Sequence, residues 1–342
     1  MRTLSLDTLA EGAAAACTTA PASPGSPGSR HAHAARDTAL DPEAQLARFA
    51  RDALIEEARL TPKPALVDAR GSGAHVDLDL ATMLRSAHAL EPTFAALSRA
   101  SRGATPGSAL RTDLARIGRA GEAAMMRATG GSNAHRGAIW IVGLLVAGAT
   151  IVHAPSGGNN AFAWGGHPWD GHPHAIEIAE TAAQIARFDD RVAPIAQPTP
   201  SNGERVRQRY NVGGARREAQ DGFPHVIHVG LPALHAARAQ GHDEAAARVD
   251  ALLAIMASLD DTCVLHRAGL AGREAAQAGA QRVRDAGGIA TRAGRAAFDA
   301  LERALLALNA SPGGAADLLA ATLFIDRLLH HRIGGRTVSW NN

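Results

Sequence analysis

The sequence predicts an all-α protein, with a single large helical domain of about ten helices and glycine-rich loops between them. Ala and Leu fill most apolar positions, and aromatic residues make up only 4% of the 342 residues. Sheets favour β-branched and aromatic side chains, so this composition favours close-packed helices. Apolar residues also recur at steps of three and four, as Ala245, Val249, Leu252, Met256 and Leu259 do. No alternation of strands and helices opposes this interpretation.

The first helix is expected to begin at the Asp-Pro-Glu sequence of residues 41–43. There an acid can cap the helix and a proline suits its first turn. A second acid interacts favourably with the positive end of the helix dipole. It should end near Leu60, because the two prolines in residues 61–64 exclude a helix and fix an extended segment. Periodicity predicts further helices, over approximately residues 78–100, 111–128, 134–152, 175–188, 231–240, 243–259, 263–286, 291–309 and 314–331.

Low-complexity composition marks the two ends of the helical domain. Residues 1–40 are rich in Ala, Ser, Pro, Gly and His, and we expect a disordered tail there. The helical domain then spans residues 41–332, and residues 333–342 form a C-terminal tail. Residues 155–174 combine Gly, Pro, Trp and His without periodicity, which predicts a flexible loop insertion within the domain.

Charge and cysteine content narrow the classes of function. The net charge of +2, without a basic block, argues against a nucleic-acid-binding surface. Two cysteines, Cys17 and Cys263, provide neither a disulfide framework nor a cysteine-based zinc site. The apolar run at 138–152 is shorter than the roughly 20 residues that a membrane span needs. The N-terminus lacks a signal-peptide pattern, so we expect a cytoplasmic protein that binds neither membranes nor nucleic acids.

Polar, glycine-bearing segments interrupt the predicted helices, and the first covers residues 62–79. It contains Lys63, the only lysine of the chain, followed by His75, Asp77 and Asp79. Two acids separated by one residue can share a Mg²⁺ ion, which prefers hard oxygen ligands. The alternative is that Asp77 and Asp79 simply cap the next helix, and the spacing slightly favours this alternative.

The second segment, Thr-Gly-Gly-Ser-Asn-Ala-His-Arg-Gly at 129–137, precedes a strongly apolar helix. Gly130, Gly131 and Asn133 favour close approach to a ligand, and His135 and Arg136 add donors at a helix N-terminus. An ordinary glycine turn is the alternative, but such a turn does not require His-Arg at the start of a buried helix. We therefore favour a contact to phosphate or ribose.

The third segment, at 201–224, holds five arginines and the only tyrosine of the chain. Arginine forks bind phosphates in a bidentate manner, and glycines let the backbone approach a ligand closely. A solvated charged helix explains the segment about equally well. The candidate binding residues are Ser201, Asn202, Tyr210, Gly213, Gly214, Arg216, Arg217 and Glu218.

The fourth segment, at 259–269, places Asp260 and Asp261 at a helix junction, with His266 and Arg267 one turn later. Paired acids there can bind Mg²⁺ or act as a general base, and an N-cap is the alternative. The fifth segment, at 311–317, is an ordinary capped helix start when considered alone. The chain contains no nucleophile elbow, Walker A sequence, dinucleotide fingerprint or HExxH motif.

Taken in order, these segments resemble the triphosphoribosyl-dephospho-CoA synthase family. The resemblance spans about residues 50–330, and the AIW ending of the third stretch and the whole sixth stretch below resemble the malonate decarboxylase branch of the family. The matching stretches are PKPALVD, GSGAHVDLD, TGGSNAHRGAIW, YNVGGARREAQDGFP, LDDTCVLHRAG and SPGGAADLLAATLF. One departure is Asn202, because the family usually has Ser-His-Gly where this chain has Ser-Asn-Gly at 201–203.

The resemblance implies a reaction and roles for the segments. ATP and 3′-dephospho-CoA would give 2′-(5″-triphosphoribosyl)-3′-dephospho-CoA and adenine, the product being a prosthetic-group precursor for the malonate decarboxylase acyl-carrier subunit. A carboxylate among Asp77, Asp79, Asp260 and Asp261 would act as base or Mg²⁺ ligand. The phosphate cations would be Lys63, Arg136, Arg216 and Arg217. A histidine would donate to adenine, the candidates being His75, His135 and His266.

Two other functions fit the same residues. A Mg²⁺-dependent N-glycosidase would use water in place of the acceptor hydroxyl. A non-enzymatic assembly factor would bind an acidic acyl-carrier protein through the arginines of residues 205–217.

Overall fold

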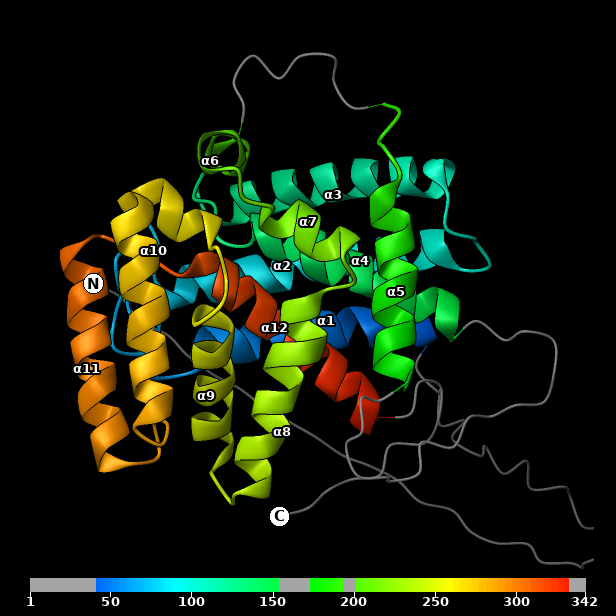
Figure 1. Ribbon diagram of the computed structural model, residues 1–342. Helices are drawn as coiled ribbons and strands as arrows, with labels where there is room; N and C mark the ends of the chain where they lie inside the picture. Colours follow the sequence, from blue (N-terminus) through cyan, green and yellow to red (C-terminus); the bar gives the residue numbers. More distant parts are fainter. Residues whose placement is uncertain (1–40, 154–172, 193–200, 332–342) are drawn as a thin grey trace, which may run out of the picture. The chain divides into compact units, whose positions relative to one another are not determined.

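The computed structural model describes residues 41–153, 173–192 and 201–331, and within these ranges it contains helices and no named strand (Figure 1). The predicted all-α class is confirmed. The helices are α1 (Pro42–Arg59), α2 (Leu80–Ser101), α3 (Ser108–Ala128), α4 (Arg136–Val152), α5 (Pro173–Arg187), α6 (Asn202–Tyr210), α7 (Gly214–Gln220), α8 (Leu231–Ala239), α9 (Glu244–Met256), α10 (Thr262–Asp285), α11 (Arg292–Ala307) and α12 (Gly313–His330). A π-helical turn at His225–Gly230 leads into α8.

Two of these helices, α6 and α7, were not among the predicted ones. Periodicity failed there because α6 is polar on nearly all sides and buries only Val206. Helices α6 and α7 therefore depend on what they pack against, and α6 contacts α10 while α7 contacts α4 and α5. The first helix ends at Arg59, as the prolines of residues 61–64 predict.

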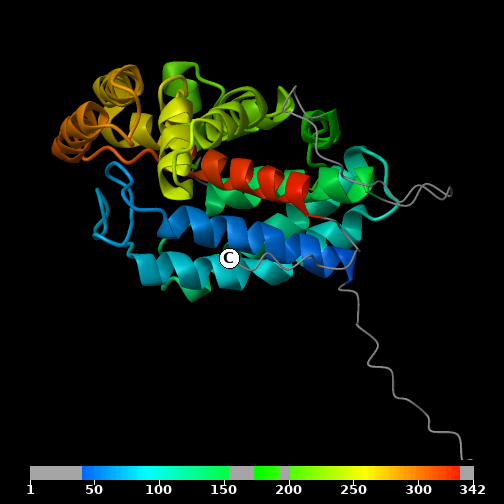
Figure 2. The same cartoon turned by 90° about the horizontal axis from the view of Figure 1, so that it is seen from below.

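Helices α4 and α12 form the centre of the helical domain. Both are apolar on almost every side, and most residues of each are buried. Helix α12 contacts α1, α4, α9 and α10, and α4 also contacts α1, α2, α3 and α5. Figure 2 shows α12 between the pair α1–α2 and the layer that includes α8 and α9. The first turns of α4 and α12 therefore lie against the interior of the domain, with Ala138 and Ala315 buried and Arg136 exposed.

Helix α10 changes direction at Gly269, whose backbone is left-handed at φ 62°. This conformation favours glycine, because a side chain would be strained there. The hydroxyl of Tyr210 lies 3.3 Å from the position that a Cβ atom of residue 269 would occupy. The short first part of α10 thus departs from the long second part, which packs against α11.

Several predictions concern segments outside the described residues. These are the two tails, at 1–40 and 333–342, and most of the expected loop at 155–174. The last two residues of that loop belong to α5, which begins at Pro173. In the described ranges, no helix is both long and apolar enough to cross a membrane.

Candidate active site

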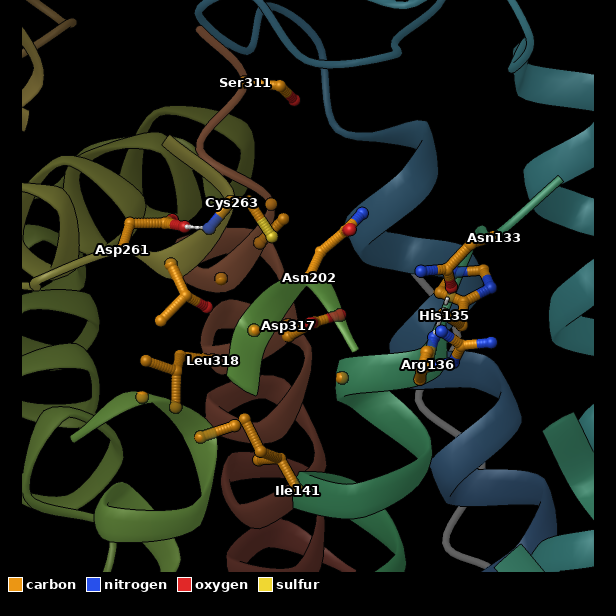
Figure 3. Close-up of a pocket in the computed structure, with 18 of the residues that line it drawn as sticks. Asn133, His135, Arg136, Ile141, Asn202, Asp261, Cys263, Ser311, Asp317 and Leu318 are labelled. Carbon is orange, nitrogen blue, oxygen red and sulfur yellow. Dashed lines mark hydrogen bonds between the residues drawn. The ribbon is translucent and has the colours of Figure 1, made fainter. Parts of the chain in front are cut away.

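A cavity of about 680 Å³ opens among the first turns of several helices (Figure 3). All five polar segments of the sequence contribute to its lining, although they are spread over some 250 residues of the chain. The starts of α4, α6, α10 and α12 line it together with the loop that follows α1. Apolar side chains such as Leu66, Ile141 and Leu318 complete the wall. Its volume is typical of small-molecule sites.

Most of the predicted site residues line this cavity. They are Lys63, His75, Asn133, His135, Arg136, Ser201, Asn202, Gly214, Arg216, Glu218, Asp260, Asp261, His266 and Arg267. Figure 3 shows Asn133, His135 and Arg136 at the start of α4, and Asp261 and Cys263 across the cavity at the start of α10.

Other predicted residues do not line the cavity. Asp79 is the N-cap of α2, where its side chain accepts a hydrogen bond from the Thr82 N–H at 2.7 Å. Asp77 is exposed, with an oxygen 3.6 Å from His75 Nδ1. Arg217 is exposed and forms an ion pair with Asp221. The full set outside the lining is Asp77, Asp79, Gly130, Gly131, Tyr210, Gly213 and Arg217.

Asp261 connects two helices at one side of the cavity. Its Oδ1 accepts from the backbone N–H groups of Cys263 and Val264 in α10, and its Oδ2 accepts from Ala315 in α12 at 2.9 Å. A Cβ atom on Gly314 would come within 2.9 Å of the same carboxylate, so only glycine permits this approach. Burial raises the pKa of Asp261, while the backbone donors oppose that shift. Both oxygens are therefore already bound by the protein.

Asp317, one turn into α12, connects α12 to α4 in a similar way. It accepts a hydrogen bond from the Ala138 N–H, and a Cβ atom on Gly137 would lie only 1.9 Å from its Oδ2. The side chain is partly exposed and lines the cavity, close to the buried side chains at the starts of α4 and α12. Desolvation at the cavity wall raises its pKa well above the ordinary range, and the carboxylates of Glu57 and Asp261 raise it further.

A buried ion pair lies next to Asp317. Lys63 Nζ donates to Glu57 Oε1 at 2.6 Å and to the Glu57 carbonyl at 2.7 Å. Their exposed fractions are 1% for Lys63 and 3% for Glu57, and both residues line the cavity. The lysine charge is thus neutralised within the protein. Asp68 fixes the loop by accepting from the Lys63 backbone N–H at 2.9 Å.

His135 completes this buried group. Its Nδ1 is hydrogen-bonded to Ser86 Oγ at 2.7 Å, while its buried Nε2 has no partner among the described residues. Burial lowers the pKa of His135 to about 3, with a smaller contribution from Lys63, so the ring stays neutral near pH 7. We call Glu57, Lys63, His135 and Asp317 the acid–histidine cluster.

Arginines form a second charged group in the cavity, which we call the arginine set. Arg136 is paired with Glu122 and Arg216 with Asp189, at 3.1 and 3.0 Å. The remaining three form no ion pair within the described ranges, and they are Arg111, Arg207 and Arg267. The arginine set therefore consists of Arg111, Arg136, Arg207, Arg216 and Arg267.

The three unpaired arginines are held in different ways. The Arg111 guanidinium stacks 4.7 Å from the Trp140 ring centroid. Arg267 donates to the Ala74 carbonyl at 2.7 Å. Arg207 has a buried Nε without a partner in the described part of the chain.

The four acids predicted as possible Mg²⁺ ligands lie in separate environments. Asp79 and Asp261 cap helices, Asp77 is exposed, and Asp260 pairs with Arg273 at 3.2 Å. The described residues contain no group of three or more His, Cys, Asp or Glu side chains that could hold a metal ion. These side chains therefore offer single carboxylates, not a complete ligand cage.

Comparison with known proteins identifies the family. Residues 43–335 match the family model described as CitG, ATP:dephospho-CoA triphosphoribosyl transferase. The chain belongs to this family. It is 55% identical over 285 residues to a protein of Azotobacter vinelandii named probable 2-(5''-triphosphoribosyl)-3'-dephosphocoenzyme-A synthase, covering 83% of this chain and 91% of that protein. A Klebsiella pneumoniae synthase of the same name, without the word probable, is 53% identical over 283 residues, covering 83% and 94%. No solved structure matches the chain.

Membership of the triphosphoribosyl transferase family confirms the expected family and its enzyme class, a transferase of a pentosyl group. The sequence had not singled out several charged residues of the cavity, namely Glu57, Arg111, Arg207 and Asp317. Arg111 and Glu57 lie within ordinary helical patterns, which carry no local signal. Asp317 had a weak signal, because it is a carboxyl near the start of a helix that is otherwise apolar nearly all round.

Proposed function

We propose that this chain transfers the triphosphoribosyl group of ATP to the 2′-hydroxyl of 3′-dephospho-CoA and releases adenine. The observation that carries the proposal is the convergence of all five segments on one cavity, within a chain of the transferase family. Both substrates are polyphosphates, and the cavity presents arginines whose guanidinium groups are not neutralised by the protein.

The arginine set suits the triphosphate better than Lys63 does. Lys63 is buried against Glu57, so a phosphate would have to compete with a carboxylate at 2.6 Å. Arg207 and Arg267 lack such a competitor within the described residues, and they approach the cavity from α6 and α10. We therefore assign phosphate binding chiefly to Arg111, Arg207 and Arg267. Arg136 and Arg216 would contribute less, because each is paired with a carboxylate.

The transfer forms a bond between the acceptor 2′-oxygen and C1 of the ATP ribose, and breaks the bond from C1 to N9 of adenine. The ribose passes through an oxocarbenium-like state, and a single displacement inverts C1. The acceptor hydroxyl loses a proton, and we assign Asp260 as the base that accepts this proton. Of the four acids predicted for this role, Asp260 is the one that lines the cavity without capping a helix.

We propose that Mg²⁺ is held mainly by the phosphate oxygens of ATP. Mg²⁺ commonly binds one or two carboxylates together with substrate phosphates and retains waters. Asp260 fits such a single contact, since it lines the cavity and its one ion pair among the described residues is with Arg273. When bound, the ion would neutralise phosphate charge.

The wider biological role is also a proposal. The likeness of two segments to the malonate decarboxylase branch supports a product that becomes the prosthetic group of that enzyme's acyl-carrier subunit, made in the cytoplasm. Deletion of the gene should then abolish growth on malonate and leave growth on citrate unchanged. Loss of growth on citrate alone would contradict this assignment.

Mass spectrometry tests the reaction directly. The purified chain, incubated with Mg²⁺, ATP and 3′-dephospho-CoA, should yield the triphosphoribosyl product and one adenine per product. Without dephospho-CoA, adenine release should stop; continued release would favour the N-glycosidase. Asp260→Asn should lower product formation by about 10²–10⁴-fold. Full activity in this variant would exclude Asp260 as the base. Absence of product with the wild type would instead favour the assembly factor.

A further inference from the structure

The proposed transfer needs a proton for the departing adenine as well as a base for the attacking hydroxyl. We propose that Asp317 is the general acid that protonates adenine as it leaves, and that His135 binds the same base. This inference rests on the transferase function proposed above and deepens it by placing adenine at the inner side of the cavity.

The position of Asp317 suits an acid. Figure 3 shows its carboxyl pointing from α12 toward the start of α4, within the cavity. Among the described residues it forms no ion pair, and it accepts a hydrogen bond from the Ala138 N–H. Desolvation at the cavity wall and the nearby carboxylates of Glu57 and Asp261 favour the protonated form of this carboxyl. A protonated carboxyl has an O–H to donate, as general acids require.

His135 supplies an independent indication of a ligand. The ring is 2% exposed and lines the cavity, and no described residue satisfies its Nε2. Buried polar atoms normally have a partner, so this nitrogen indicates a place for a polar atom of a substrate. A neutral imidazole can donate to or accept from a purine nitrogen, according to its tautomer.

The two residues belong to one continuous region of the cavity. Lys63 is close enough to His135 to lower the pKa of the ring, and Lys63 is bound to Glu57. Glu57 in turn is close enough to Asp317 to raise the pKa of its carboxyl. A base that contacts His135 therefore lies near the Asp317 proton.

Other candidates for the acid are less well placed. Asp261 already binds backbone donors of two helices through both oxygens. His75 Nε2 is 2.9 Å from Ser311 Oγ. Burial and then the nearby Arg267 lower the pKa of the His75 ring, against an opposing effect of Asp77, and this disfavours a protonated ring. His266 is exposed.

The step balances in atoms and electrons. The electron pair of the bond between C1 and N9 remains on adenine, and the purine receives the proton of Asp317. The acceptor oxygen bonds to C1 and its proton passes to Asp260. A later exchange of protons with water returns both carboxyls to their starting forms.

The test uses a leaving group that needs no acid. ATP methylated at N7 carries a positively charged base, which leaves as neutral 7-methyladenine. Asp317→Asn keeps an oxygen for the Ala138 N–H but cannot supply the proton. With ATP, its kcat should fall about 10²–10⁴-fold. With N7-methyl-ATP, its kcat should lie within about fivefold of the wild type, after subtraction of the uncatalysed rate.

Two further variants sharpen the result. Asp299→Asn, the same chemical change at an exposed site on α11, should leave both rates unchanged. Gly137→Ala would displace the Asp317 carboxyl without changing its chemistry, and should show the same loss with ATP and the same recovery. This variant also provides the test if Asp317→Asn does not fold.

The outcomes are distinct. Recovery with N7-methyl-ATP in the Asp317 variant supports the acid role. Equal losses with both substrates would indicate a structural role for Asp317 and overturn the inference, as would full activity with ATP. Absence of the triphosphoribosyl product with the wild type would instead reject the proposed function itself.

Discussion

Two groups of charged side chains line the same cavity, and they differ in how completely the protein satisfies them. In the acid–histidine cluster, Lys63 and Glu57 neutralise one another in a buried pair, His135 is buried, and Asp317 is partly exposed beside them. In the arginine set, Arg111 and Arg207 lack a carboxylate partner among the described residues. Burial shifts the pKa values of acids and histidines, which suits proton transfer during catalysis. Arginines without a carboxylate partner suit the binding of negatively charged substrates.

The largest effect is expected from breaking the buried pair. Glu57→Gln would leave the Lys63 ammonium buried at 1% exposure without its carboxylate. Removing one partner of a buried pair costs about 3–5 kcal/mol of folding free energy. Denaturant unfolding measures this loss.

The matched control removes both charges. A Glu57→Gln, Lys63→Met double variant should recover most of the stability, because no unpaired charge remains buried. If the double variant is as unstable as Glu57→Gln, the loss comes from packing and not from the charge.

A smaller effect is expected in the arginine set, and it should appear in substrate binding. Arg207→Ala should raise the KM for ATP roughly 10- to 100-fold, since a hydrogen bond to a charged group contributes about 1.5–3 kcal/mol. Steady-state kinetics at fixed salt measure it. Arg209→Ala, on the same helix but stacked on Tyr210 outside the lining, serves as the control. An equal rise of the KM for ATP in both variants would indicate general electrostatic attraction and contradict a specific contact of Arg207 with phosphate.

Asp261 lines the cavity but serves as a helix cap, so its replacement should affect stability. Asp261→Ala should lower the free energy of unfolding by about 0.5–2 kcal/mol, because α10 and α12 lose an acceptor for their first N–H groups. Thermal and denaturant unfolding give the value. Asp261→Asn retains one oxygen acceptor and should lose less; an equal loss would mean that the charge matters more than the cap.

The smallest effect concerns Asn202, which stands where the family resemblance leads us to expect a histidine. Asn202 is exposed at the cavity and already accepts a hydrogen bond from Arg205. Asn202→His should change kcat/KM by less than about tenfold, since the amide can also hydrogen-bond to a substrate. Product formation by mass spectrometry compares the two forms, and a much larger gain would assign that position an acid–base role.

The sequence predicted most helices because their apolar stripes repeat at helical steps, as from Ala245 to Leu259. It did not predict α6, which has only one buried residue and forms against α10. In the site, local spacing could not decide whether Asp79 is a cap or a ligand, since both uses need a carboxylate before a helix. The structure places Asp79 as a cap.

The sequence by itself determined the helical class, the segments that interrupt the helices and the resemblance to the family, because each depends on composition or on neighbours along the chain. Only the tertiary structure decided which charges meet. Glu57 and Asp317 are 260 positions apart, yet the packing of α1 and α12 brings their carboxyls close enough to perturb one another. Pairing, burial and pKa depend on distance in space, and that distance is set by the packing of α4 and α12 at the centre of the domain.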